Sequence, residues 1–204
     1  MPDIFHGERV LVVENKIIFK DGAWRGLKTD KLNHYLKLIR DNCKFIKRAE
    51  AEESRDFQQI IPFTIFKHRN QFFLYRYSKK IKERRLRGQY MLGIGGHINP
   101  ADQNKNIDLL LAGAEREWQE EVGLRGKIIS KKVLGILNDD RRRVEAVHLG
   151  IIYVFEGDRP DIFVRETSKI KGEMMTVKEM EPLMAKSDSF SWAATTYPYL
   201  KSLK

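Results

Sequence analysis

The sequence has one cysteine and no long apolar run. Cys43 has no second thiol in the 204 residues, which excludes an internal disulfide and a zinc site built from several cysteines. No stretch approaches the roughly 20 apolar residues that a membrane-spanning helix needs. The first ten residues contain Asp3 and Glu8 instead of a basic segment leading into an apolar one. We therefore expect a soluble, cytoplasmic protein.

Acidic residues are also in short supply. There are 28 Asp and Glu against 38 Lys and Arg, which gives a formal net charge of +10. Such a charge attracts phosphate-bearing ligands, nucleic acid or anionic membranes, so it does not select one partner. Much of the excess lies in residues 79–87 and 141–143. Each run fits either a solvated loop or a phosphate-facing segment.

The length and composition predict one main domain with an N-terminal elaboration. A chain of 204 residues that is 42% hydrophobic can bury one sizeable core, and it shows no internal repeat or low-complexity linker. We expect an N-terminal extension over residues 1–58 and the main domain over residues 59–204. Within the extension, local patterns predict strands at 9–13 and 16–19 forming a hairpin, a helix at 31–46 capped by Asp30, and a short helix at 49–56.

The main domain should alternate strands and helices. We expect Pro62 to open a strand at 63–66 that forms a hairpin with 71–77, and a helix at 108–122 to stop at Gly123. Residues 131–137 and 147–155 are β-like, and the stretch after Gly157 is expected to be loop. Further helices are predicted at 176–184 and from about 195.

Three glutamates share one face of the helix predicted for residues 108–122. Glu117, Glu120 and Glu121 are three and four residues apart, and Arg116 can pair with Glu120. A separate apolar line can bury the helix; it consists of Leu110, Ala114, Trp118 and Val122. Clustered carboxylates repel one another until a hard divalent cation binds them. The face is therefore either a metal platform, able to activate water beside a phosphate, or a solvated acidic surface.

Residues 95–124 resemble the Nudix box. That pattern is a glycine, five residues, a glutamate, seven residues, Arg-Glu, a bulky apolar residue, any residue, Glu-Glu, any residue, Gly and a bulky apolar residue. The segment REWQEEVGL, residues 116–124, matches its second half. The resemblance implies that Glu117, Glu120 and Glu121 bind Mg²⁺, with Mn²⁺ as a substitute, that Arg116 orients them, and that the carbonyl of Gly95 or Gly96 completes the coordination. It also implies a Nudix α/β/α sandwich with a mixed β-sheet.

The first half of the box departs from the pattern. Asp108 stands where a glutamate belongs, and eleven residues separate it from Gly96. Asp102 keeps the five-residue spacing, so a six-residue insertion accounts for both observations. We expect an exposed loop between about Pro100 and Ile107, and Asp108 can serve as a cap of the helix. Trp118 is aromatic where an aliphatic residue is commoner.

The residues around the glycines resemble a particular branch of this family. The segment GIGGHIN, residues 93–99, looks like the predicted Nudix phosphoesterases that also carry an N-terminal extension. His97 and Asn99 either contact substrate or stabilise the loop. The candidate cations for the substrate's charged chain are Arg76, Arg85 and Arg87. The candidates for a downstream base or extra ligand are Glu166 and Glu173, with Glu145 behind them.

By this resemblance the protein is a metal-dependent hydrolase that cleaves a phosphoanhydride bond in a nucleoside-diphosphate-linked or related small molecule. A second interpretation is a catalytically silent Nudix-fold regulator that binds nucleotides or nucleic acid, with Trp24, Tyr75 and Tyr77 stacking on bases. The clustered glutamates argue against it. A third is an isomerase of prenyl diphosphates, which would need a cysteine near the pocket, whereas Cys43 lies in the N-terminal extension. The substrate and the oligomeric state stay open.

Overall fold

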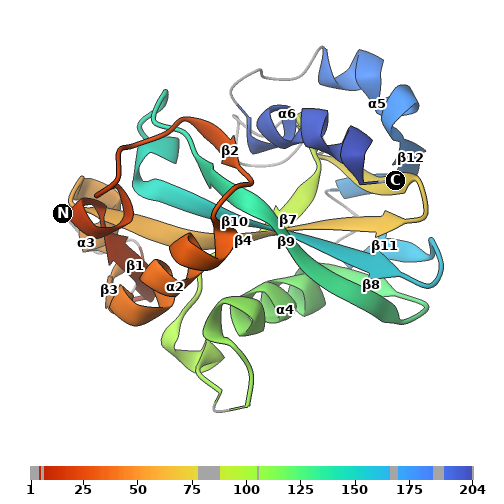
Figure 1. The fold of residues 1–204 in the computed structure, drawn as a ribbon. Helices are drawn as coiled ribbons and strands as arrows, with labels where there is room; N and C mark the ends of the chain where they lie inside the picture. The colour runs from red at the N-terminus through yellow and green to blue at the C-terminus, as the bar shows by residue number, and fades with distance from the viewer. Residues whose placement is uncertain are drawn as a thin grey trace. The chain divides into compact units, whose positions relative to one another are not determined.

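The computed structural model describes residues 5, 7–77, 88–104, 106–165, 170–185 and 191–203. The main β-sheet is hydrogen-bonded in the order β12-β5-β4-β10-β9-β2, with β1, β3, β6 and β7 joined to it at its strands (Figure 1). This architecture confirms the prediction of a mixed α/β fold with a large sheet. No helix among the described residues is long and apolar enough to cross a membrane.

The chain forms two compact units. Unit 1 comprises Met1–Phe63, Gly95–Arg116 and Leu134–Ile152, and unit 2 comprises Thr64–Ile94, Glu117–Val133 and Tyr153–Lys204. Five elements have residues in both units: β4 (Phe57–His68), β7 (Gly93–Gly95), α4 (Leu109–Glu121), β9 (Ile128–Asn138) and β10 (His148–Gly157).

Unit 1 holds the N-terminal elements and two short 3-10 helices. They are β1 (Arg9–Glu14), α1 (Asn15–Ile18), β2 (Gly26–Lys28), α2 (Leu32–Asn42), β3 (Lys44–Lys47), α3 (Arg48–Glu53), η2 (Pro100–Asp102) and η3 (Glu145–Val147). Strand β1 is wholly buried along its centre, where Val10 and Val12 pack against Ala51 of α3. The extension residues therefore contribute part of the core of this unit.

The prediction of an N-terminal hairpin is wrong. Residues 16–19 do not form a strand, because both edges of β1 are already paired, with β3 through Arg9↔Lys47 and with β4 through Val12↔Gln59. The chain turns into helix α1 instead. The predicted helix at 31–46 stops at Asn42 for the same reason, since residues 44–47 are the strand that pairs with β1. Asp30 does not cap α2: the residue before that helix is Lys31, at φ 53°.

Strand β4 begins at Phe57, earlier than the expected start at Pro62. A proline has no N–H to give to a ladder, so it interrupts pairing with a neighbour. The ladder of β4 with β1 covers 57–59, and its ladder with β5 covers 67–68. Pro62 lies between these two ladders.

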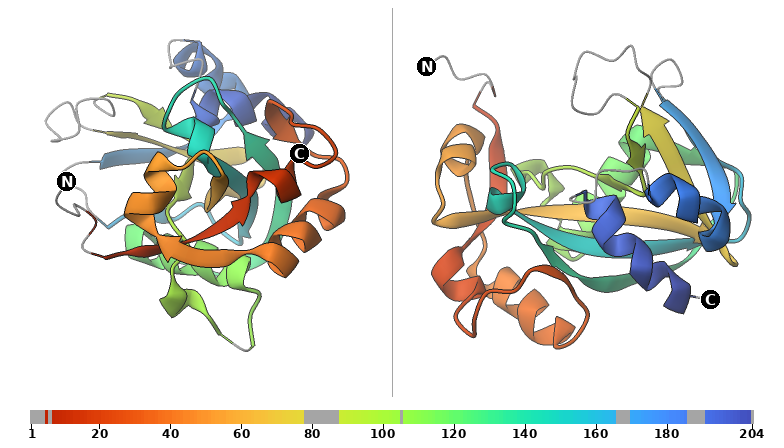
Figure 2. Two further views of the ribbon diagram at one scale, coloured as in Figure 1. Left: turned by 90° about the vertical axis from the view of Figure 1, so that its left-hand side faces the viewer. Right: turned by 90° about the horizontal axis from the view of Figure 1, so that it is seen from above.

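Unit 2 contains the remaining elements. They are β5 (Gln71–Tyr77), β6 (Tyr90–Met91), β8 (Val122–Leu124), β11 (Ile162–Val164), β12 (Ile170–Thr176), α5 (Val177–Met184), α6 (Trp192–Thr196) and η4 (Tyr197–Ser202). Strands β5 and β12 run side by side over their full lengths, from Ile170↔Tyr77 to Thr176↔Gln71 (Figure 2). The expected loop after Gly157 therefore contains two strands, whose pairing partners lie far away in the sequence. Helix α5 was predicted, and Thr176 caps it with Glu179.

Helix α4 buries its apolar line as predicted. Leu110, Ala114, Trp118 and Val122 are at most 7% exposed. Within unit 2 the Trp118 ring lies 5.5 Å from that of Phe66 and 5.6 Å from that of Phe155. The aromatic residue that is unusual at this box position thus fills an aromatic cluster and fixes the rotation of the helix.

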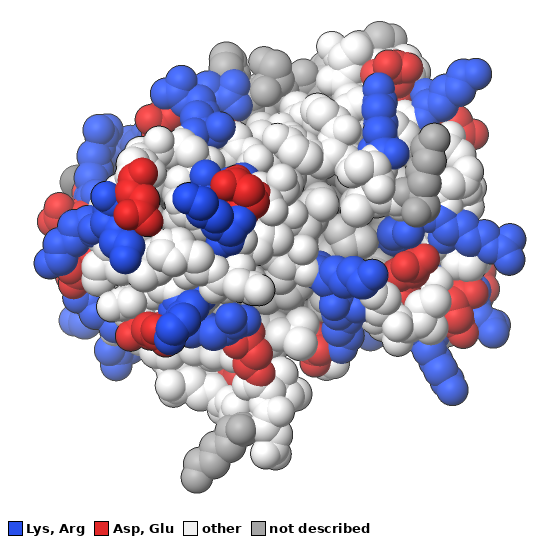
Figure 3. Space-filling model, in the orientation of Figure 1, with Lys and Arg blue, Asp and Glu red and all other residues white. Residues whose placement is uncertain are grey.

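The charge of +10 is spread out on the face drawn in Figure 3. Lys and Arg side chains are distributed over this face, with Asp and Glu between them. Of the two basic runs, Arg141, Arg142 and Arg143 are exposed, and Arg141 pairs with Asp139. The run at 79–87 lies outside the described residues.

Candidate functional site

The three box glutamates occupy the last two turns of α4. Glu120 is exposed, and Glu117 and Glu121 are partly exposed. Arg165, which the sequence analysis did not single out, closes the end of the helix: its Nε donates to the carbonyls of Gln119 and Val122 at 2.8 and 3.0 Å. A cation at this position favours the helix terminus. Three carboxylates are therefore held on a short, capped segment that solvent reaches.

Gly123 follows the helix because no side chain fits there. A Cβ at this position would lie 2.3 Å from Cζ of Phe163, on the strand β11 that pairs with β8. The box glycine thus allows β11 to approach the end of α4, which agrees with the predicted stop of the helix at this glycine.

Arg116 is held by an aspartate of the preceding loop. Its Nε donates to Oδ1 of Asp102 at 2.7 Å, and its Nη2 donates to Oδ2 at 3.1 Å and to the carbonyl of His97 at 2.7 Å. The Asp102 side chain is only 2% exposed. This two-pronged, charge-assisted contact is the strong form of an Arg–carboxylate pair. The five-residue spacing from Gly96 marked Asp102, but only the structure shows its partner.

The described residues of the predicted insertion are exposed except Asp102. Pro100–Asp102 forms the 3-10 helix η2, which is separate from α4, while Gln103, Asn104 and Asn106 are exposed. Oδ1 of Asn99 accepts from the N–H of Ala101, and the N–H of Asn99 donates to Asp102. Both bonds stabilise the loop, which is one of the two roles considered for Asn99.

Asp108 caps α4. Its Oδ1 accepts from the N–H of Leu111 at 3.2 Å, and its Oδ2 accepts from Nε of Arg40 at 2.6 Å. The capping role considered for this residue is confirmed.

The two adjacent glycines lie at the end of β7. A Cβ on Gly95 would meet the carbonyl oxygen of Pro62 at 2.9 Å, so the close approach of β4 requires a glycine. Gly96, the predicted carbonyl ligand, is partly exposed, and His97 follows it.

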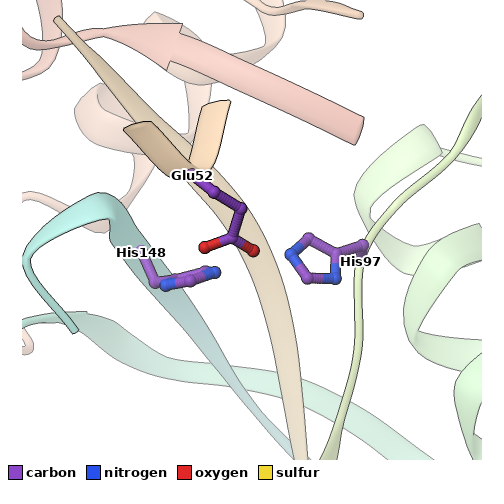
Figure 4. A group of neighbouring side chains, drawn as sticks. All are labelled: Glu52, His97 and His148. Atoms are coloured by element: carbon purple, nitrogen blue, oxygen red, sulfur yellow. The ribbon is translucent and has the colours of Figure 1, made fainter. Parts of the chain in front are cut away.

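His97 belongs to a cluster that the sequence analysis did not predict. Glu52 of α3, His97, and His148 of β10 each place one donor atom so that all three atoms lie within 4.8 Å of one another. Figure 4 shows both rings turning a nitrogen toward the Glu52 carboxylate. Within the described part of the chain, the α4 glutamates do not form a group of this kind. The three residues are separated by about 45 and 50 positions in the sequence, so no local pattern predicts that their side chains come together.

The two histidines of this cluster are uncharged at neutral pH. Burial, together with the smaller effects of the Arg48 charge and of His148, lowers the pKa of His97 to about 3. Burial also lowers the pKa of His148, against the effect of its bond to the Val144 carbonyl.

Acid should therefore destabilise the metal-free protein through His97. Above pH 6.5 the imidazole is neutral in both the folded and the unfolded chain, so His97 does not lower the free energy of unfolding. As pH falls from 6.5 toward 3, only the unfolded chain gains the proton, and stability is lost. At pH 5 this amounts to about 2 kcal/mol. Urea unfolding in EDTA at pH 7 and pH 5 should show a smaller pH difference for His97→Gln than for the parent; equal differences would contradict the assignment.

Three other predicted substrate or base residues lie in the described part of the chain. Arg76 donates from Nε to the carbonyl of Gly88 at 3.0 Å and lies over the Tyr90 ring, so it braces the β5–β6 segment. Glu173 is exposed on β12 opposite Leu74. Glu145, in η3, is half-buried and acts electrostatically on His148. The other predicted residues, Arg85, Arg87 and Glu166, lie outside the described residues.

The aromatic residues proposed for base stacking are engaged within the fold. Tyr75 is 4% exposed and its hydroxyl donates to the carbonyl of Gly93. The Trp24 ring packs against Phe19 and Tyr35 at 5.4 and 5.0 Å. Strand β5 includes Tyr77, whose side chain lies outside the description. Tyr75 is therefore buried, and the partly exposed Trp24 packs within an aromatic cluster of unit 1.

Two further features complete the inventory of candidate sites. Cys43 is free and partly exposed at the end of α2, where its Sγ contacts the carbonyl of Arg40 at 3.6 Å.

Unit 2 has a pocket of about 400 Å³ between α5, η4 and the start of β5, lined by residues that include Phe72, Val177 and Tyr197. None of the residues lining this pocket was predicted as a site residue.

Known proteins resemble this chain over most of its length. Protein YmaB of Bacillus subtilis (strain 168) is 28% identical over 181 residues, which cover 85% of this chain and 88% of YmaB. The crystal structure of Tm1382, described as a candidate Nudix hydrolase, matches with a TM-score of 0.82 and 26% identity over 97% of this chain and all of Tm1382. MutT from Methanosarcina mazei Go1 matches with a TM-score of 0.41 and 18% identity over 71% of this chain and 93% of MutT. No protein-family model matches.

The large mixed sheet, together with a helix that ends in three box glutamates, defines an α/β protein of the Nudix fold. The match to Tm1382 spans 97% of the chain, so the correspondence includes the N-terminal elements. The chain therefore has the fold of Tm1382 and, like it, resembles the Nudix hydrolases. This fold supports a hydrolase activity of the pyrophosphohydrolase type.

Proposed function

We propose that the protein is a Mg²⁺-dependent hydrolase of phosphoanhydride bonds in a nucleoside-diphosphate-linked or related small molecule. The observation that carries the proposal is the segment REWQEEVGL on a regular, capped helix in a chain that matches Tm1382 along nearly its whole length. The carboxylate oxygens of Glu117, Glu120 and Glu121 are the hard donors that Mg²⁺ prefers, and solvent reaches them.

The chain's own residues would prepare this chemistry in three ways. The α4 glutamates would hold the cation. Arg116, fixed by Asp102 and by the His97 carbonyl, ties the glycine loop to the helix that carries the glutamates. Trp118 fixes the rotation of α4. When bound, Mg²⁺ would polarise the phosphate and lower the pKa of an attacking water.

Hydrolysis can be tested on the full-length protein with a substrate panel. Release of phosphate or mononucleotide is measured over dinucleotides, nucleoside diphosphate sugars and nucleoside triphosphates, in Mg²⁺, in Mn²⁺ and in EDTA. We expect turnover of at least one class in Mg²⁺, its loss in EDTA and its recovery when Mg²⁺ is restored. Turnover that persists in EDTA, or binding of nucleotides without turnover of any compound in either metal, would contradict the proposal. The second of these outcomes would favour a catalytically silent nucleotide-binding protein.

A further inference from the structure

We propose that Glu52, His97 and His148 form a second metal site, which takes a divalent transition metal of the Zn²⁺ class. The three side chains come from α3, from the loop after β7 and from β10, and their donor atoms all lie within 4.8 Å of one another (Figure 4). Two imidazoles and one carboxylate are the ligand set that Zn²⁺ and similar ions accept, with open positions left for water or substrate. None of the three belongs to the REWQEEVGL segment, so this site has its own ligands.

The His148 ring is already oriented as a ligand. Its Nδ1 donates to the carbonyl of Val144, which places the ring proton on Nδ1 and leaves the lone pair of Nε2 for a metal. The residue is only 8% exposed, so this orientation is fixed by its surroundings. A backbone carbonyl that holds the second nitrogen of a histidine is a recurrent feature of metal sites.

Gln59 adds an oxygen beside His97. Its Oε1 lies 2.9 Å from Nε2 of His97, and the residue is wholly buried. Nε2 of the Gln59 amide has no hydrogen-bond partner, although it is buried. Such an amide costs free energy in a fold unless it serves another purpose. A carbonyl oxygen beside the His97 imidazole is suited to be a fourth ligand.

The charges around the cluster favour a cation. Arg48 pairs with Glu8 at 2.9 Å and with Glu52 at 3.3 Å, so two carboxylates face one guanidinium. With both imidazoles neutral, these groups carry one net negative charge.

Ligand chemistry distinguishes this site from the one proposed on α4. Imidazole nitrogens suit Zn²⁺, whereas Mg²⁺ prefers oxygen ligands and retains several waters. The cluster should therefore bind Zn²⁺ in the presence of excess Mg²⁺. Its occupancy should not depend on Glu120 or Glu121.

The first test measures Zn²⁺ binding to the metal-stripped, full-length protein in millimolar Mg²⁺ by isothermal titration calorimetry. We expect one Zn²⁺ per chain. Glu52→Gln and His148→Gln should each weaken binding by about 100-fold or more, since loss of an outer-shell partner alone costs 10–100-fold. The matched control is Glu53→Gln, an exposed glutamate one residue along α3, which should bind as the parent does. Glu120→Gln should also retain this binding, whether or not the variant hydrolyses any substrate.

A second measurement uses only the parent protein, so it does not depend on whether a variant folds. The parent protein is loaded with one equivalent of Cu²⁺, and electron paramagnetic resonance is used to look for coupling to coordinated imidazole nitrogens. Coupling to two nitrogens is expected, because the α4 glutamates offer only oxygen. Absence of nitrogen coupling, absence of Zn²⁺ binding, or Zn²⁺ binding unchanged in Glu52→Gln and His148→Gln would each overturn the site.

Discussion

Glu120→Gln is expected to lower turnover in Mg²⁺ by roughly 100-fold or more while leaving the melting temperature in EDTA nearly unchanged. A bound cation supplies several kcal/mol of charge stabilisation in the transition state, and each 1.4 kcal/mol is tenfold in rate. A neutral amide is a weaker ligand for a hard cation than a carboxylate. Stability should respond differently, because removal of one of three like charges on a helix face relieves repulsion. Glu121→Gln is expected to behave in the same way.

The matched control for these variants is Glu115→Gln. Glu115 lies on the same helix, and its substitution by Gln removes the same charge. Its position two residues before Glu117 places it on a different face of the helix. We expect its turnover to match the parent's. If Glu120→Gln melts much earlier than the parent and yet keeps full activity when folded, the glutamates are structural and the proposed metal site on α4 is wrong.

Arg116→Met is expected to reduce the free energy of unfolding by about 2–4 kcal/mol. The substitution leaves the Asp102 carboxylate, 2% exposed, without its cation, and removal of one partner from a buried pair typically costs 3–5 kcal/mol. We expect a loss near the lower end of this range because Arg116 is 25% exposed and because the N–H of Asn99 still donates to Asp102. Urea denaturation in EDTA measures the change.

Two further variants separate this pair from a surface effect. In Asp102→Asn/Arg116→Met no buried charge remains, so the double variant should be more stable than Arg116→Met alone. Arg40→Met breaks the pair with Asp108, whose members are 45% and 31% exposed, and should cost no more than about 1 kcal/mol. Equal losses for Arg40→Met and Arg116→Met would show that burial of Asp102 is not the cause.

Local sequence patterns correctly predicted the elements whose periodicity and capping residues lie within one stretch of chain. Helix α4, its buried line, the stop before Gly123 and the cap at Asp108 all follow from residues within a few turns of one another. Helix α5 was predicted for the same reason, because Thr176 and Glu179 carry their own capping signal. The loop expected between Pro100 and Ile107 is also separate from α4.

The predictions failed where a distant partner decides the structure. Residues 16–19 are β-like in sequence, but β3 and β4 occupy both edges of β1 and exclude them. Strand β12 contains Gly172 and Glu173, which disfavour strands, and it forms because β5 supplies a full ladder. The cluster of Glu52, His97 and His148 combines three segments of the chain, so no spacing could indicate it.

The thiol at the end of α2 makes this chain a single-site target for cysteine reagents. Burial raises the pKa of Cys43, which reduces the thiolate fraction at neutral pH, and its Sγ is directed to the carbonyl of Arg40. Alkylation of the native protein should therefore be slow and should accelerate when the last turn of α2 opens. Because Cys43 is the only cysteine of the 204 residues, the mass added by a maleimide reports the opening of this turn alone, without a mutation.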